Sequence, residues 1–308
     1  MKRLHLILVL FLTSLVFPQT NNPVYITGSI NDVCMNPVFS PDGKTIAYTK
    51  SGYQGIWIYD LSTQLSKEIT DEPAAGFAYK WSSDSKSILS RVAKYEDQKR
   101  FNAVKVFDIE TNQALQLTEY RTRMPYLPEW SDGDTKVILP SKNGVEVYSS
   151  GKQESAVTIN KSVDAFVKDD KIVARSVVTG TENVLEPIKD AQVINLVTSP
   201  DKNKVAFEVM GGNMYSMNID GTNLTDLGKG NRPLWSSDSK KIIYMITEDD
   251  GYTFTASDVY TINVDGTQKK NITNTPDKIE MDPCFSPDGK MVAFDVYNDG
   301  SIYLMNIE

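Results

Sequence analysis

The chain has 308 residues, of which 40% are hydrophobic and 23% charged, with 32 basic against 40 acidic side chains. This length and hydrophobic content suffice for one large domain or two smaller ones. The formal net charge of −8 disfavours nucleic acid and anionic membranes as partners.

The first twenty residues predict an export signal. Lys2 and Arg3 precede the apolar residues 4–17, and polar residues follow, as in a secretory signal peptide. This apolar stretch is short for a membrane span, although an uncleaved anchor is the alternative. We assign residues 1–20 to the signal and 21–308 to a single mature domain, periplasmic or secreted, with no further membrane span. Without Lys2 and Arg3, 30 basic residues face 40 acidic ones, a net charge of −10.

One short phrase recurs along the mature chain. It reads FSPDGK at 39–44 and again at 285–290, and looser copies begin at Trp81, Trp130, Phe166, Thr198 and Trp235. The mean spacing is about 41 residues, a period typical of four-stranded propeller blades. Seven copies predict seven blades, and six is the alternative because the copy at Phe166 is the most divergent.

Each copy predicts a strand, a tight turn and a second strand. Proline suits the second position of a turn, and Gly43 suits a left-handed position after it, which we expect Asn203 to take in another copy. Alternating β-branched and aromatic residues follow, as in a strand. A second repeated phrase supplies strands three and four, with hairpin turns at Asp220-Gly221 and Asp265-Gly266.

The two ends of the chain complement each other. Only one strand, residues 302–307, fits after the last copy, while residues 23–28 precede the first copy and have no blade of their own. Antiparallel sheets must cover their open edges, so we expect the first segment to complete the last blade and close the ring. Cys34 and Cys284 fall on the first and last inner strands, either bridged across the closure or as two buried thiols.

The phrases F-S-P-D-G-K-x-[IV]-A-[FY] and D-G-T-x-x-x-[IL]-T resemble the repeats of the TolB-like, WD-type β-propeller family. The resemblance covers about residues 23–308. It implies an all-β propeller of four-stranded antiparallel blades that binds a protein or peptide partner at the cell envelope. TolB carries an α/β domain before its propeller, whereas the repeats here begin directly after the export signal.

The composition of the mature chain argues against catalysis. Its one histidine, His5, lies in the signal, which excludes Ser-His-Asp and Cys-His sites and histidine-ligated zinc. Oligogalacturonate lyases share this repeat type and use histidine-ligated metal, so the chain departs from them. We predict no catalytic residue, no cofactor and no metal site.

Paired carboxylates are the remaining route to catalysis. The candidates are Glu72, Glu119, Glu129 and Asp164. The alternative function is therefore a carbohydrate-binding or carbohydrate-active protein that uses loop carboxylates and tyrosines.

One face of the ring is expected to bind the partner, an envelope or extracellular protein or peptide, with a glycan as the alternative. We call it the long-loop face: it carries the turns between strands two and three and the blade-to-blade connections, including the long segments 93–102, 119–128 and 246–258. The opposite, short-turn face carries the FSPDGK-type turns. Variable loops on a rigid scaffold often bind partners, and Tyr and Arg are enriched at hot spots. The candidate residues are Tyr95, Arg100, Phe101, Tyr120, Arg121, Arg123, Tyr126, Tyr252 and Phe254.

Overall fold

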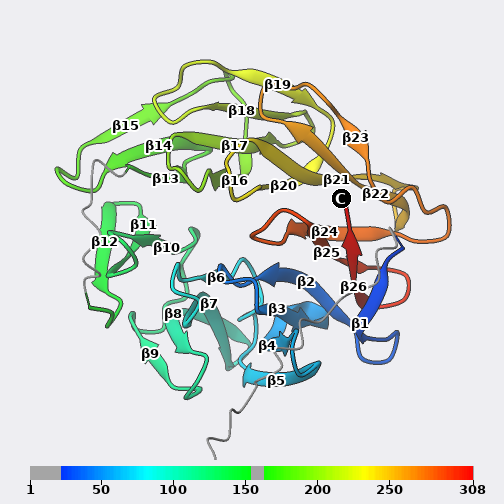
Figure 1. Cartoon of the computed structure of the whole chain (residues 1–308). Coiled ribbons are helices and arrows are strands. Elements are labelled where there is room, and N and C mark those ends of the chain that lie inside the picture. The colour runs from blue at the N-terminus through cyan, green and yellow to red at the C-terminus, as the bar shows by residue number, and fades with distance from the viewer. Residues whose placement is uncertain (1–21, 154–162, 308) are drawn as a thin grey trace, which may run out of the picture.

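A computed structural model describes residues 22–153 and 163–307, and its strands form seven antiparallel sheets arranged in a ring (Figure 1). The seven-bladed prediction is confirmed, and the six-bladed alternative is wrong. The only helical element in these ranges is the 3-10 helix η1 (Ser51–Tyr53). Within the same ranges, no helix has the length and apolar character needed to cross a membrane. The predicted signal, residues 1–20, lies outside the described residues.

The blades follow one another along the chain. Blade 1 holds β2 (Cys34–Phe39), β3 (Thr45–Lys50), β4 (Gln54–Asp60) and β5 (Leu65–Thr70), and blade 2 holds β6 (Lys80–Trp81), β7 (Ser87–Glu96), β8 (Lys99–Asp108) and β9 (Ala114–Gln116). Blade 3 holds β10 (Glu129–Ser131), β11 (Lys136–Ser141) and β12 (Gly144–Ser149), and blade 4 holds β13 (Val163–Lys168), β14 (Lys171–Ser176) and β15 (Glu182–Leu185). Blade 5 holds β16 (Val193–Thr198), β17 (Lys204–Val209), β18 (Met214–Asn218) and β19 (Thr225–Gly228). Blade 6 holds β20 (Asn231–Trp235), β21 (Lys241–Asp249), β22 (Phe254–Asn263) and β23 (Lys270–Asn271). Blade 7 holds β24 (Glu280–Phe285), β25 (Met291–Val296), β26 (Ser301–Asn306) and β1 (Val24–Gly28).

The ring closes as predicted. Strand β1 pairs antiparallel with β26, from Val24 opposite Leu304 to Gly28 opposite Ser301 (Figure 1). Cys34 and Cys284 are free thiols buried in one hydrophobic cluster between the first and last blades. The closure therefore rests on strand pairing and apolar packing rather than on a disulfide.

The repeated phrase holds its turn through a buried serine. The Ser40 hydroxyl donates to Asp42 Oδ1 (2.7 Å) and accepts from Thr45 N (3.1 Å), and the same Asp42 oxygen accepts from Lys44 N (3.1 Å). The serine–aspartate bond recurs in the turns that begin at Ser82, Ser199, Ser236 and Ser286. The repeated aspartates thus stabilise turns, because each carboxylate joins a hydroxyl to a backbone amide.

The left-handed position in these turns is the residue after the aspartate. Gly43 (φ 70°) occupies it in blade 1, and Lys202 (φ 60°) occupies it in blade 5. The expectation for Asn203 is therefore wrong by one residue. Ser85 (φ 61°) and Ser239 (φ 59°) take the same conformation, so the surrounding turn dictates the backbone even where glycine is absent.

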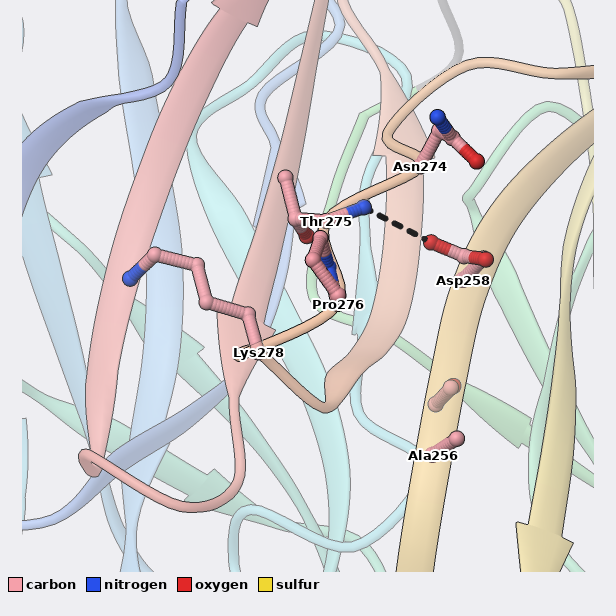
Figure 2. Close-up of a pocket in the computed structure, with 7 residues that line it drawn as sticks. Ala256, Asp258, Asn274, Thr275, Pro276 and Lys278 are labelled. Carbon is pink, nitrogen blue, oxygen red and sulfur yellow. Dashed lines mark hydrogen bonds between the residues drawn. The ribbon is translucent and has the colours of Figure 1, made fainter.

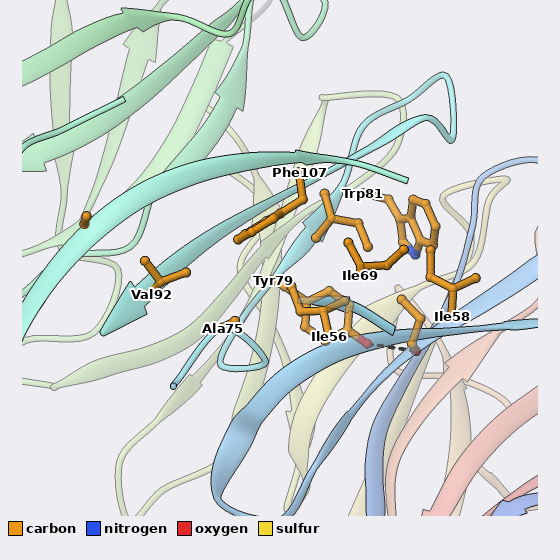
Figure 3. Close-up of a cluster of buried hydrophobic side chains, with 11 residues drawn as sticks. Ile56, Ile58, Ile69, Ala75, Tyr79, Trp81, Val92 and Phe107 are labelled. Carbon is orange, nitrogen blue, oxygen red and sulfur yellow. Dashed lines mark hydrogen bonds between the residues drawn. The ribbon is translucent and has the colours of Figure 1, made fainter. Parts of the chain in front are cut away.

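The core lies between neighbouring blades. Ile56, Ile58 and Ile69 of blade 1 pack with buried side chains from blade 2 and its entry, including Trp81 and Phe107 (Figure 3). The buried Tyr79 hydroxyl donates to the Ala47 carbonyl oxygen (2.9 Å) across this interface. Each blade therefore completes its hydrophobic face only against its neighbours.

Blade 4 departs from the predicted repeat. Its Asp169-Asp170 turn meets the long-loop face, since Tyr126 donates to Asp169 Oδ1 (2.7 Å) and Val193 N donates to the Asp170 carbonyl (3.4 Å). The other end of β13 meets the short-turn face, where Asp164 accepts from the Ser131 hydroxyl (2.7 Å).

Strand β13 therefore runs opposite to the other inner strands. The segment that begins at Phe166 does not form the turn of the repeated phrase, because it lacks the serine that organises that turn. The seven-blade count nevertheless holds, since β13–β15 form a sheet of their own.

Two segments expected to be long loops are extended β-hairpins instead. Strands β7 and β8 stay paired as far as Glu96 opposite Lys99, and β21 and β22 stay paired as far as Asp249 opposite Phe254. The β7–β8 turn is Asp97-Gln98, both left-handed (φ 48° and 60°), as a two-residue hairpin with a type I′ turn requires. Both hairpins extend from the long-loop face.

Candidate partner-binding face

The inner strands bulge at one repeated position on the long-loop side of the central channel. The residue three places before the anchor residue is left-handed in blades 1, 2, 5, 6 and 7: Asn36, Ala78, Asn195, Arg232 and Asp282. An acid of the preceding blade satisfies two of these backbone amides, since Asn36 N donates to Asp295 Oδ1 (2.8 Å) and Arg232 N donates to Glu208. The hydrogen bonds that these acids accept join neighbouring blades.

Buried charges gather where these bulges reach the channel. Arg232 forms an ion pair with the buried Asp282, and its Nη2 donates to the Tyr53 hydroxyl (3.3 Å). Burial raises the pKa of Asp282, although Arg232 opposes the rise, and burial together with the nearby Asp282 raises the pKa of Asp295 well above its usual range. The sequence signal that would have found Asp295 and Glu208 is an acid ten residues after the anchor, inside an apolar strand.

A chain of rings leads from the channel towards blade 2. Tyr53 meets Phe77 edge to face with 5.1 Å between ring centroids, and the Arg91 guanidinium lies 5.6 Å from the centre of the Phe77 ring. Such cation–π contacts orient a guanidinium without neutralising it. Arg91 thus stands at the inner end of a hollow between blades 2 and 3.

This blade 2–3 hollow has a volume of about 410 Å³, and Arg91, Arg100, Asn102 and Arg123 line it. Arg91 Nη1 donates to the Met124 carbonyl (2.9 Å), whereas its Nε is buried without any hydrogen-bond partner. Burial, and then the charge of Arg100, lower the pKa of Arg91. In the described part of the chain, no carboxylate pairs with any of the three arginines. The hollow is therefore rich in unneutralised donors.

Four of the predicted residues beside the hollow are already engaged within the protein. Arg121 donates to both carboxylate oxygens of Glu146 (2.8 Å each), and Tyr126 donates to Asp169. Tyr120 donates to Glu72 Oε2 (3.2 Å), and Lys94 lies over the rings of both Tyr120 and Phe101. Tyr95, by contrast, is 61% exposed near the tip of the β7–β8 hairpin.

The remaining two predicted residues lie on blade 6, apart from the others. Tyr252 is 98% exposed in the β21–β22 turn, and the Phe254 ring meets the Tyr297 ring edge to face at 5.7 Å. The structure therefore brings Arg100 and Arg123 to one hollow and places Tyr95 on the hairpin above it. Tyr252 and Phe254 belong to a second projection of the same face.

A second hollow, of about 420 Å³, lies between blades 6 and 7 beside Asp258, Thr275 and Lys278 (Figure 2). Its acid is already satisfied, because Asp258 accepts from Thr275 N (3.2 Å), the Thr273 hydroxyl (3.1 Å) and Asn271 Nδ2 (2.9 Å). Lys278 points away from Asp258 in Figure 2 and pairs with Asp299 (3.2 Å). The side chains around this hollow hold the connection between blades 6 and 7 in place. Fewer of their charges lack a partner than in the blade 2–3 hollow.

Three of the four acids considered for catalysis are held by a lysine or a hydroxyl. Glu72 pairs with Lys105 (2.8 Å), Glu129 pairs with Lys80, and Asp164 accepts from Ser131. Glu119 is exposed. Sequence reasoning missed Asp282 and Asp295, two buried acids of which the first raises the pKa of the second beyond the effect of burial.

Solved structures of other β-propellers share this architecture. Putative TolB from Agrobacterium tumefaciens matches with a TM-score of 0.56 and 14% identity over 90% of this chain and 91% of that one. The β-propeller domain of Myceliophteria thermophila Cps50 (Swd1) matches with a TM-score of 0.61 and 10% identity over 93% and 100%. The fold is that of the TolB and Swd1 propellers.

Other matches are partial or weaker, and they limit what the likeness shows. TolB from Acinetobacter baumannii matches with a TM-score of 0.52 and 17% identity over 77% of this chain, which spans only 53% of that protein. Oligogalacturonate lyases also match, but at TM-scores of 0.49 and 0.48 they support no argument about activity. No family model and no curated protein sequence matches the chain. At these identities the likeness shows the fold alone.

Proposed function

We propose that this TolB-like propeller is an exported, non-catalytic binding protein whose long-loop face holds a protein or peptide partner at the cell envelope. The observation that carries the proposal is the blade 2–3 hollow, where three arginines without a carboxylate partner lie below the exposed Tyr95. Arginine and tyrosine dominate interface hot spots. On an acidic protein, such a local basic site favours a specific partner over general adhesion.

Two further observations support an exported, non-catalytic role. The signal pattern in residues 1–20 supports export. The range 21–308 contains no histidine, and three of the four acids considered for catalysis are tied to a lysine or a hydroxyl: Glu129, Glu72 and Asp164. A rigid scaffold with projecting hairpins suits binding better than proton transfer.

The proposal is tested by capture from an envelope extract with the purified mature protein and two double variants. Tyr95→Ala with Tyr252→Ala alters both projecting hairpins, and Lys44→Ala with Lys240→Ala alters two exposed positions of the short-turn face. We expect one defined partner to be retained by the wild type and the short-turn variant and lost by the hairpin variant. Equal retention by all three proteins would place binding elsewhere.

A carbohydrate-active role is the second candidate, and the pair Asp282–Asp295 beside Arg232 is the observation that favours it. Two acids with raised pKa values beside a channel are one arrangement used in glycoside hydrolysis. Both carboxylates are more than nine-tenths buried, which favours the structural role. Product formation from an envelope glycan that stops in Asp282→Asn would support this candidate over the binding role.

A further inference from the structure

The blade 2–3 hollow contains an arginine with one unused edge. Arg91 spends Nη1 on the Met124 carbonyl, and no described residue accepts a hydrogen bond from Nε or Nη2. Leaving a buried charged donor unpaired is costly. Because Nε has no exposed surface whereas Nη2 keeps some, Nη2 is the atom of Arg91 that a carboxylate in the hollow would meet, in a charge-assisted hydrogen bond.

The neighbouring arginines complete a positive cradle. Arg91 and Arg100 lie on the same face of the β7–β8 hairpin, because side chains alternate along paired strands and Arg100 stands opposite Tyr95 in register. Arg123 and Thr122 form the facing wall. In the same connection, Arg121 holds both carboxylate oxygens of Glu146 with two hydrogen bonds, so this wall already binds one carboxylate of the protein itself.

The edge of the hairpin favours a peptide as the ligand. On the inner edge of β7, the last backbone hydrogen bond runs from Ala93 N to the Pro73 carbonyl (2.7 Å). On the outer edge of β8, the last pairing is between Asn102 and Arg121. Beyond these points, neither edge pairs with another strand of the described chain. Unpaired strand edges bind extended peptide backbone by adding a strand, which a glycan cannot do.

We propose that the blade 2–3 hollow binds a carboxylate of an acidic peptide segment, held by Arg91, Arg100 and Arg123 while the peptide backbone lies along the β7–β8 hairpin. This inference rests on the proposed function and names the chemistry of the partner. The carboxylate comes either from an Asp or Glu side chain or from a free chain terminus.

The test uses four short probes on the mature protein and follows the arginine Nε–H signals by NMR. Acetylated, amidated hexaglutamate carries side-chain carboxylates only, acetylated hexaserine with a free terminus carries one α-carboxylate, acetylated, amidated hexaserine carries none, and a hexameric uronate carries them on a glycan. We expect one of the two carboxylate peptides to shift the Arg91 Nε–H signal and the neutral peptide to leave it unchanged. The peptide that binds identifies the source of the carboxylate.

Matched variants separate the cradle from general attraction. Arg100→Gln and Arg123→Gln should each weaken the peptide about tenfold, as loss of a charge-assisted hydrogen bond does. Lys99→Gln removes the same charge from the same hairpin tip, but on its other face, and should change affinity less than about twofold. An equal loss in Lys99→Gln, an unchanged Arg91 signal with both peptides, or binding of the uronate alone would overturn the proposal. Loss of the partner in the hairpin variants of the capture assay would then still sustain the proposed function.

Discussion

The ring closure makes a sharp prediction at Gly28, the last residue of the closing strand. Gly28 has φ +97°, and a methyl group there would lie 2.5 Å from the Gly300 carbonyl oxygen and 2.9 Å from Ser301 Cα. Both contacts are with backbone, so Gly28→Ala must displace β1 from β26. The loss combines strain of about 1 kcal/mol with several ladder hydrogen bonds of about 1 kcal/mol each. We expect the free energy of unfolding to fall by about 2–5 kcal/mol.

The matched control is Gly289→Ala in the same blade. Gly289 is also left-handed (φ +73°), but nothing lies within 4 Å of the added methyl group, so it should cost only the strain of about 1 kcal/mol. Urea unfolding measures both variants, and hydrogen exchange of the amides in Val24–Gly28 reports whether β1 detaches. Equal losses in the two variants, with unchanged exchange in β1, would refute the closure.

Three further predictions concern buried acids, turns and the hairpin tip. Burial and the nearby Asp282 raise the pKa of Asp295, so the contribution of this carboxyl to stability is complete below its unfolded pKa of about 4 and is lost as pH rises through its folded pKa. The melting temperature of Asp295→Asn should therefore rise relative to that of the wild type between pH 4 and pH 8. A difference that stays constant over this range would contradict the raised pKa. Ser40→Ala should cost about 1–3 kcal/mol in urea unfolding, because it leaves Thr45 N and Asp42 without their buried partner; a change within about 0.5 kcal/mol, the size of an ordinary surface effect, would show that the serine does not hold the turn. Gln98→Gly should stabilise the protein by up to about 1 kcal/mol, because Gln98 is left-handed (φ 60°) in a tight hairpin turn, whereas a flexible loop would lose stability on gaining glycine.

The fold was predictable because its repeats carry local turn chemistry. The FSPDGK phrase fixes a turn through Ser40 and Asp42 alone, and the same local bond recurs in four further copies, so five of the seven copies identify their blades without tertiary information. The copy at Phe166 misled, because the direction of β13 depends on contacts with Tyr126 and Ser131. Sequence position does not encode such contacts, and only the three-dimensional arrangement reveals that β13 is inverted.

The elements that build the long-loop face were predictable, whereas the arrangement of its side chains was only partly so. Loop length pointed to residues 93–102, but the alternation there is masked by charged residues on exposed strands, and the segment proved to be a paired hairpin. Arg91 was not predicted as a site residue, because it lies within an apolar strand, where a single charged side chain indicates an exposed strand edge. Its importance depends on a missing partner at Nε, which only the packed structure shows.

Photo-crosslinking in the cells that produce the protein tests the central claim most directly. A photoreactive phenylalanine analogue replaces Tyr95 or Tyr252 on the long-loop face, or Lys44 or Lys240 on the short-turn face, all of them exposed. The account predicts a discrete protein adduct from position 95, position 252 or both, and none from 44 or 240. An adduct confined to the short-turn positions would contradict it.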